Sequence, residues 1–507
     1  MKKILKFLTG RAFVTGLLLA FQLFLLIAGI LFLSQSFVYL NAVFILFSIA
    51  ITLYIIDKKD NPMYKLAWIV PILLFPALGG ILYFIFGKRN IAPKARRQMQ
   101  KIAERLNRTA KADNSLLSKL ARENDTAAKQ AVYIQGCTGF PVCQNTYTRF
   151  LTPGEEKFAA LIDELKKAER FIFLEYFIIE EGRMWNTVLD ILTAKAREGV
   201  EVRVLYDDMG TINLLPAGYP KKLHELGIQT QVFNPFKPSL DIFMNYRDHR
   251  KIAVIDGDMG ITGGINLADE YINAYPKHGY WKDSSLLLKG NGVWSLTLMF
   301  LAMWEYCTGK PEDCQKYRPR KQTEAQGYVQ PFCDSPVDDI PVGENAYLNM
   351  LNHAKRYVYI ATPYLILDNE MATALCLAAQ SGVDVRIITP HIGDKWYVHE
   401  TTRANYSQLL ERGVQIYEYL PGFVHAKTMV VDDEFAIVGT TNFDFRSFYL
   451  HFECGAYMYS NDVLHDVEQD FKETLKQCQE ITKESCDKYP KGKMLVGKML
   501  RLIAPLM

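Results

Sequence analysis

One pattern of residues occurs twice in this chain, with the same spacing in both copies. The copies are His249-x-Lys251-x4-Asp256-x6-Gly263-Gly264-x-Asn266 and His425-x-Lys427-x4-Asp432-x6-Gly439-Thr440-x-Asn442. For average composition, one such match in a random chain of this length has odds on the order of one in ten thousand. The period of roughly 180 residues is far longer than that of a solenoid repeat. The repeat therefore predicts two homologous units.

A strand, a helix and a second strand precede each copy of the pattern in the same order. In the first unit these are 171–177, 184–198 and 199–205, and in the second they are 357–364, 369–380 and 382–388. Strands that alternate with helices are typical of βαβ units, which predicts an α/β fold with a mostly parallel sheet. We expect two homologous α/β domains, at 130–321 and 322–486, that form one pseudo-twofold site.

The composition excludes several classes of protein. With 507 residues, 49% of them hydrophobic, the chain has enough apolar surface for a packed core, which excludes disorder as its main state. Nine cysteines without a C-x-x-C pair indicate neither a disulfide scaffold nor a zinc ribbon. The formal net charge of +3 is too small to indicate nucleic-acid binding by itself.

The N-terminal segment is almost free of charge. No charged residue lies between Arg11 and Asp57, and three apolar stretches occur at 13–33, 38–56 and 66–86. Each is long enough to cross a bilayer core of about 30 Å as a helix. We therefore predict a multi-pass membrane anchor within residues 1–90.

Basic residues flank the predicted anchor on both sides, four before the first span and six between Lys88 and Lys101. The larger, second cluster favours a cytoplasmic location for the rest of the chain. Three full crossings would separate the two clusters, so one span could instead be re-entrant. Residues 91–129 are expected to be a basic juxtamembrane connector, and 487–507 a basic amphipathic tail. Both segments suit either a lipid surface or packing on the protein.

The repeated pattern has the residue types of a phosphate site. Histidine and lysine two positions apart on a strand point to the same face, and glycine lets the backbone approach closely. Facing units would bring together His249, His425, Lys251, Lys427, Asn266 and Asn442. Lysine supplies charge, asparagine supplies donors, and one histidine can attack while the other moves protons. Asp256 and Asp432 each end a strand before a turn, which indicates a structural role for these two motif residues.

The double H-x-K-x4-D motif resembles that of the phospholipase D superfamily. Other stretches are similar to bacterial cardiolipin synthases, namely 61–69, 80–87, 245–251, 361–364, 419–427, 442–448 and 503–507. The resemblance covers nearly the whole chain. Thr440, where many members have Ser or Gly, and the first apolar span are mild departures.

The resemblance implies an enzyme that transfers a phosphatidyl group between two phosphatidylglycerol molecules, making cardiolipin and releasing glycerol. By analogy, His249 attacks phosphorus to form a phosphohistidine, and His425 moves protons to and from the two glycerol groups. The sequence itself leaves these two roles exchangeable. Glu453 and Asp283 resemble the acidic partners of the two imidazoles.

The resemblance also implies which partners the chain has. We expect phosphatidylglycerol and membrane lipids as partners, no nucleic acid, and a bacterial cell membrane as the location. No metal or other cofactor is expected, because two lysines already neutralise the phosphate and no histidine cluster has ligand spacing. Tyr176 and Tyr364 end strands that we take as equivalent, and they are expected to line the site or its rim. The sequence does not indicate an oligomeric state.

Three alternative functions differ from this one in the features that they predict. A membrane-bound phospholipase D would use the same histidines with water as acceptor. A nuclease would share the phosphodiester chemistry but is expected to have a basic groove with aromatic stacking. A non-catalytic scaffold would predict decay of one motif, whereas both are intact.

Overall fold

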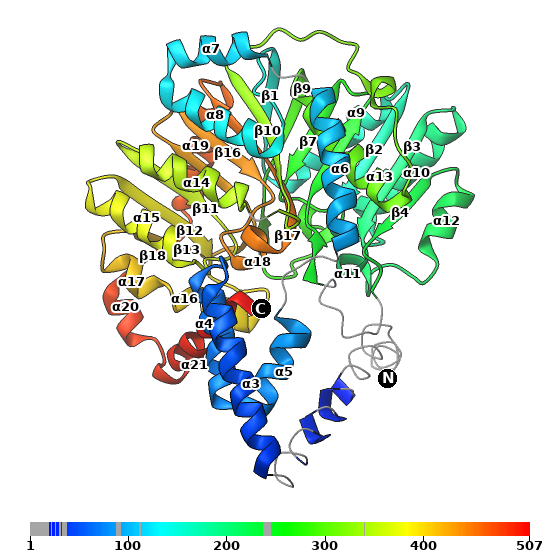
Figure 1. The fold of residues 1–507 in the computed structure, drawn as a ribbon. Helices are drawn as coiled ribbons and strands as arrows, with labels where there is room; N and C mark the ends of the chain where they lie inside the picture. The colour runs from blue at the N-terminus through cyan, green and yellow to red at the C-terminus, as the bar shows by residue number, and fades with distance from the viewer. Residues whose placement is uncertain are drawn as a thin grey trace.

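A computed structural model describes residues 38–87, 93–110, 113–236, 245–338 and 340–506, together with scattered positions between 20 and 32. The predicted apolar span at 13–33 therefore lies largely outside the described residues. Two sheets stand side by side in the body of the molecule, and helices of the N-terminal segment project from one end of it (Figure 1).

The first sheet has seven strands in the order β1-β9-β7-β6-β2-β3-β4. They are β1 (Thr146–Leu151), β2 (Phe171–Tyr176), β3 (Glu201–Asp207), β4 (Gln229–Phe233), β6 (Lys251–Ile255), β7 (Met259–Gly263) and β9 (Ser285–Gly290). The helices of this half are α9 (Gly154–Lys166), α10 (Arg183–Arg197), α11 (Asp208–Thr211), α12 (Tyr219–Glu225) and α13 (Val293–Thr308).

The second sheet repeats this order, as β10-β17-β16-β15-β11-β12-β13, and then adds β18. Its strands are β10 (Tyr328–Asp334), β11 (Tyr357–Ala361), β12 (Asp384–Pro390), β13 (Gln415–Tyr419), β15 (Thr428–Val431), β16 (Phe435–Gly439), β17 (His451–Tyr459) and β18 (Cys478–Ile481). Its helices are α14 (Val342–His353), α15 (Asn369–Gln380), α16 (Trp396–Arg403), α17 (Tyr406–Leu410), α18 (Phe445–Tyr449) and α19 (Val463–Leu475). The predicted duplication of an α/β unit is confirmed.

The expectation of a mostly parallel sheet is wrong. Only β2, β3 and β4 pair in parallel in the first sheet, whereas β2-β6, β6-β7, β7-β9 and β9-β1 are antiparallel. The reason is the short turn at Asp256–Asp258, which joins β6 to β7 without a crossover helix. A parallel pair needs a crossover of a dozen or more residues, so the motif strand must form a hairpin with the next strand.

The sheets share one central core and have an outer core each. Along β2, Phe171 and Phe173 face the central core, whereas Ile172 and Leu174 face the outer core of the first half. Side chains of α13 and α19 lie in the central core with both sheets. The strands are thus buried on both faces, which explains their nearly continuous apolar sequence.

The N-terminal helices α3 (Val38–Asp57), α4 (Pro62–Leu74) and α5 (Pro76–Phe86) contact one another and project from the body (Figure 1). Asn61 joins them to the second half, because its Nδ2 donates to Asp368 at 2.9 Å and to the Tyr449 hydroxyl at 3.0 Å. Of the helices in the described part of the chain, none combines the length and the apolarity that a membrane crossing requires.

The expected connector at 91–129 packs on both halves where the structure describes it. Helix α6 (Pro93–Ala110) lies on α13, and Arg105 pairs with Glu305 of that helix. Helices α7 (Asn114–Glu123) and α8 (Asp125–Thr138) pack together, and α8 contacts α14 of the second half.

The expected tail forms α20 (Lys483–Lys488) and α21 (Lys491–Ile503). Helix α21 lies on α16, where Gly497 is buried so close to the backbone that an added Cβ would lie 2.5 Å from Glu400 O. Leu495 and Met499 of the same helix are exposed. The helix therefore packs on the protein with one face and leaves an apolar face uncovered.

Candidate active site

Each half lends a short strand to the other half. β5 (Arg247–Asp248) of the first half pairs in parallel with β17 of the second, and β14 (Gly422–Val424) of the second pairs in parallel with β8 (Tyr280–Lys282) of the first. These exchanged strands end directly before the two motif histidines. The exchange therefore brings both copies of the motif into one site.

Backbone hydrogen bonds fix the two histidines in equivalent places. The N–H of His249 donates to Phe452 O at 3.0 Å, and the N–H of His425 donates to Lys282 O at 2.7 Å. The residues that follow these two carbonyls are acids, Glu453 and Asp283. Both acids come two residues before paired positions in the sheets, Ser285 beside Gly263 and Gly455 beside Gly439. Each half therefore supplies the acid for the histidine of the other half, from an equivalent position in its sheet.

His249 lies against the carboxylate of Glu453. Its Nδ1 is 2.9 Å from Oε1 and 3.0 Å from Oε2, and Glu453 is fully buried. The hydroxyl of Thr440 donates to the same carboxylate, and the ring of Phe177 contacts the imidazole with its centroid 5.1 Å away. An Nδ1–H that donates to Glu453 leaves the lone pair on Nε2, where a nucleophile or base needs it.

His425 has the corresponding contact with Asp283. Its Nδ1 lies 2.6 Å from Oδ2 of Asp283 and 2.7 Å from the Lys427 ammonium nitrogen. Trp281 and Tyr271 flank the ring, with centroids 5.3 Å and 5.5 Å away. Buried aromatic side chains thus shield this imidazole, whose own side chain is 8% exposed.

Both imidazoles are held in the neutral form. Burial, reinforced by the charges of Lys251 and Lys427, holds the pKa of His249 well below its usual value. Burial and Lys427 lower the pKa of His425 to about 4. A neutral imidazole is competent as nucleophile at pH 7, and a bound phosphate anion would raise both pKa values again.

The motif lysines lie beneath the histidines, fully buried. The ammonium group of Lys251 donates to the carbonyl of His249, and that of Lys427 donates to the carbonyl of His425. Burial lowers the pKa of Lys251 to about 8 and that of Lys427 to about 7. The two ammonium groups therefore lack a full complement of counter-charge, which favours an anionic ligand.

The two motif asparagines have different surroundings. Asn266 accepts from the backbone N–H of Ile178 at 2.9 Å and donates to the Tyr271 hydroxyl at 2.7 Å. Asn442 is also buried, but its Oδ1 has no hydrogen-bond partner among the residues that the structure describes. Asn266 is thus engaged with protein groups, and Asn442 keeps hydrogen-bonding capacity for a ligand.

The motif aspartates are placed at the far ends of the motif strands. Asp256 accepts from the backbone N–H groups of Glu169, Arg170 and Phe171, and Asp432 accepts from those of Lys355, Arg356 and Tyr357. Both aspartates have positive φ, 56° and 58°. Each carboxylate therefore ties the β-turn after the motif strand to the start of the neighbouring strand, away from the imidazoles.

The small residues of the motif make room for these contacts. An added Cβ on Gly263 would lie 2.4 Å from the Cα of Ser285, and one on Gly264 would lie 2.1 Å from the carboxylate of Asp283. The counterpart of Gly264 in the second half is Thr440, which donates to Glu453 instead. The same position therefore clears space for one acid and binds the other.

The prediction that Tyr176 and Tyr364 end equivalent strands is wrong. Tyr176 ends β2 and pairs with Lys251, whereas Tyr364 lies beyond the end of β11. The hydroxyl of Tyr176 is 3.2 Å from the buried ammonium of Lys157, which the sequence did not single out. Tyr364 donates to Asp394 at 2.8 Å.

A third imidazole in the site was missed by the sequence reasoning. His451 begins β17, and its ring centroid lies 5.4 Å from that of His249. The ligand atoms of His249, His451 and Glu453 lie within 4.8 Å of one another, and this is the group among the described residues that could hold a metal ion. The spacing His451-x-Glu453 was the available signal, because residues two apart on a strand share a face.

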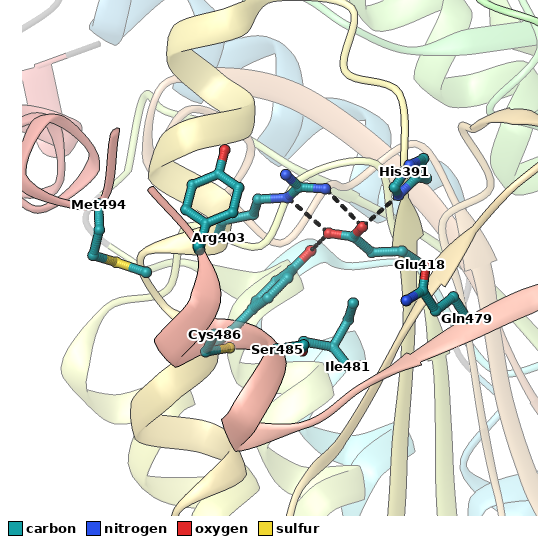
Figure 2. Close-up of a pocket in the computed structure, with 10 residues that line it drawn as sticks. His391, Arg403, Glu418, Gln479, Ile481, Ser485, Cys486 and Met494 are labelled. Carbon is teal, nitrogen blue, oxygen red and sulfur yellow. Dashed lines mark hydrogen bonds and ion pairs between the residues drawn. The ribbon is translucent and has the colours of Figure 1, made fainter. Parts of the chain in front are cut away.

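A separate cavity of about 220 Å³ lies between the second half and the C-terminal helices. Figure 2 shows Arg403 and His391 directed at the Glu418 carboxylate. The guanidinium donates to both oxygens, at 2.9 and 2.7 Å, and His391 Nδ1 lies 2.7 Å from Oε2. These groups satisfy one another, and the cavity lining shares no residue with the motif site.

Comparison with known proteins gives two matching family models. One is described as cardiolipin synthase, PLD-like domain, and matches residues 161–275 and 347–475. The other is described as phospholipase D-nuclease N-terminal and matches residues 42–88.

Two relatives and one solved structure are similar to this chain over most of its length. A cardiolipin synthase of Alkalihalophilus pseudofirmus is 34% identical over 96% of this chain and 98% of its own length. An uncharacterized protein of Streptococcus mutans is 45% identical over 90% of this chain and 99% of its own length. The crystal structure of a phosphatidylserine synthase from Haemophilus influenzae matches the fold with a TM-score of 0.59, at 15% identity, over 75% of this chain and 100% of that one.

Proposed function

The chain belongs to the cardiolipin synthase family of phospholipase D-like proteins, and from this we propose that it joins two phosphatidylglycerol molecules into cardiolipin with release of glycerol. The observation that carries the proposal is the exchange of acids between the halves. Each motif imidazole is oriented by a carboxylate of the other half, so both copies of the motif serve one phosphodiester.

In the first step, the Nε2 lone pair of His249 forms a bond to phosphorus as the bond from phosphorus to the glycerol headgroup oxygen breaks. The bound phosphate anion raises the pKa of His425, so that this imidazole is protonated in the complex. It gives its proton to the leaving oxygen, and glycerol leaves. The intermediate is a phosphatidyl group on His249. Glu453 stabilises the positive charge that develops on the attacking imidazole, as a buried carboxylate does for a histidine base.

In the second step, His425 takes the proton of the terminal hydroxyl of a second phosphatidylglycerol. The hydroxyl oxygen forms a bond to phosphorus as the bond from phosphorus to His249 breaks, which releases cardiolipin. The proton that His425 gave in the first step is thereby regained, so the cycle consumes no proton. Lys251 and Lys427 stabilise the phosphoryl charge in both steps.

Transfer to a lipid hydroxyl requires that water be kept from the phosphohistidine. The side chains of His249 and His425 are only 9% and 8% exposed. Aromatic rings on the His425 side narrow access further, and they belong to Trp281, Tyr271 and Phe423. This enclosure supports transfer over hydrolysis.

We further propose the arrangement of the chain at a bacterial cell membrane. Residues 1–90 form a multi-pass anchor, 91–129 a connector, 130–321 and 322–486 the two phospholipase D-like domains, and 487–507 an amphipathic tail at the lipid surface. The exposed apolar face of α21 and the basic residues of this tail support the last assignment. The site residues face the cytoplasm in this arrangement.

Phosphatidylglycerol vesicles test the reaction directly. Purified protein is incubated with phosphatidylglycerol as the sole lipid, and the products are separated. Cardiolipin and glycerol in equal amounts are expected. Phosphatidic acid and glycerol without cardiolipin would instead make the protein a hydrolase.

A further inference from the structure

His451 is a buried group in the site that the proposed reaction does not use. Its side chain is 9% exposed, the same as that of His249. Neither ring nitrogen has a hydrogen-bond partner among the described residues. Its Nδ1 lies 3.6 Å from Oε1 of Glu453, which is longer than a hydrogen bond.

Leaving these nitrogens without partners is costly. A buried donor or acceptor without a partner costs about 1–3 kcal/mol in folding free energy, so buried polar groups in proteins are nearly all paired. Within β17, Phe452 follows His451 directly, and Arg247 of β5 lies beside it in the sheet. A purely structural residue at this place would gain stability by being apolar, which indicates that the imidazole serves a ligand.

The surroundings of His451 define the chemistry of that ligand. The ring lies beside His249, and its pKa is lowered first by burial and then by the charges of His249 and Arg446. Burial is the main cause of that shift, and it brings the pKa to about 3. The imidazole is therefore neutral at pH 7, with one N–H to donate.

We propose that His451 binds the lipid phosphodiester directly, by donating its ring N–H to a non-bridging phosphoryl oxygen beside the attacking His249. This role deepens the proposed function and rests on it. A neutral donor adds a hydrogen bond to the phosphoryl group without adding a further positive charge to the site. A divalent cation at the same three side chains is disfavoured, because Lys251 and Lys427 already make the site electropositive.

Two substitutions of equal size separate the hydrogen bond from packing. His451→Asn keeps a side-chain N–H and His451→Leu does not, whereas both leave the same space. Glycerol release from phosphatidylglycerol vesicles is measured over a range of lipid concentrations. Donors aimed at charge that develops in the transition state act on kcat. We expect His451→Leu to lower kcat about a hundredfold, with a much smaller change in KM.

His451→Asn is expected to retain at least about tenfold more activity than His451→Leu. Inhibition by inorganic phosphate provides a second measurement, because Leu should weaken it and Asn should preserve it. His465 of α19, whose side chain is 79% exposed, gives the matched control. His465→Phe should have the same kcat and the same inhibition by phosphate as the wild-type protein. If His451→Leu does not fold, His451→Phe takes its place in the comparison.

Equal kcat values for the Asn and Leu variants, with equal inhibition by phosphate, would overturn the proposal. Glycerol release reports cleavage of the headgroup whichever acceptor follows. If the unchanged protein made phosphatidic acid rather than cardiolipin, the proposed acceptor would be wrong, and the Asn and Leu variants would still decide the role of His451.

Discussion

The two sides of the active site share a backbone plan but differ in how they hold their imidazoles. On one side, Glu453 reaches Nδ1 of His249 with both oxygens and is itself held by the hydroxyl of Thr440. On the other side, the shorter Asp283 reaches His425 with one oxygen and occupies space that Gly264 leaves open. One position of the motif thus adjusts for the length of the acid, so either acid can orient the histidine.

The sides also differ in what surrounds each imidazole. His249 has a second imidazole, His451, and the ring of Phe177 beside it. His425 lies among Trp281, Tyr271 and Phe423. In the proposed reaction, the imidazole beside His451 attacks phosphorus, and the imidazole enclosed by aromatic rings handles the proton of an alcohol. The two copies of the motif therefore differ in their surroundings.

The largest expected effect comes from removing either histidine. His249→Ala and His425→Ala should each lower turnover of phosphatidylglycerol by at least about 10⁴-fold, because in the proposed reaction each performs a step that the other cannot. A phosphatidyl ester of p-nitrophenol separates the roles, since its leaving group needs no proton.

With that ester, His425→Ala should still release one equivalent of p-nitrophenol and form the phosphoenzyme, whereas His249→Ala should not. A burst from His249→Ala and none from His425→Ala would reverse the assignment of the two sides. Near-normal turnover by either variant would contradict a shared site.

The next largest effect is expected from the two acids that contact the motif histidines. Glu453→Gln and Asp283→Asn keep size and remove the charge that fixes each tautomer, and each should lower kcat about 10³- to 10⁴-fold. Steady-state rates measure this, with circular dichroism as the control for folding. If only one of the two substitutions had an effect, the equivalence of the two sides would be refuted.

The lysines should make activity fall as the pH rises. Phosphate binding needs the charged ammonium groups, and the pKa of Lys427 is about 7 and that of Lys251 about 8. kcat/KM, which reports groups of the free enzyme, should therefore decline as the pH rises through 7 to 8. Asp283 raises the pKa of Lys427, so Asp283→Asn should move this decline to lower pH. A rate that is level up to pH 10 would exclude the lysines as the cause.

The motif aspartates should affect stability rather than chemistry. Asp256→Asn and Asp432→Asn fit the positive φ and remove only the charge that binds three backbone N–H groups. Each should lower the unfolding free energy by about 2 kcal/mol and leave kcat of the folded protein nearly unchanged. Chemical denaturation and initial rates measure the two effects. A large loss of kcat without a loss of stability would assign the aspartates to the reaction.

The smallest effect is expected at the position that distinguishes the sides. Thr440→Ser keeps the hydroxyl that Glu453 accepts, and its kcat should stay within about twofold of the unchanged protein. Thr440→Val removes the hydroxyl at constant size and should lower kcat about tenfold. Equal rates for Ser and Val would show that the hydroxyl does not position Glu453.

Much of the fold could be predicted from the sequence, because strands and helices depend on the pattern of residues within short segments. The runs at 171–177 and 357–364 predicted strands that the structure contains as β2 and β11, since a strand buried on both faces needs continuous apolar residues. Whether two strands pair in parallel or antiparallel could not be predicted from short segments alone. The turn after Asp256 makes a hairpin where a crossover was expected, and the parallel prediction failed for that reason.

Site residues could be predicted from the sequence where their spacing indicated a shared function. The motif identifies His249 and Lys251 because chemistry needs both on one face of a strand. His451 had no repeat in the other half to mark it. Its place beside His249 follows from the pairing of β5 with β17, which joins residues about 200 positions apart.

The sequence by itself determined that the chain is a duplicated α/β protein of this family, because the repeat spacing and the apolar runs are properties of short segments. Only the tertiary structure decided which acid serves which histidine. Glu453 follows its own motif in the chain yet binds His249, and Asp283 binds His425, because each half passes a short strand to the sheet of the other. Such an exchange depends on packing between the halves, and no local pattern encodes it.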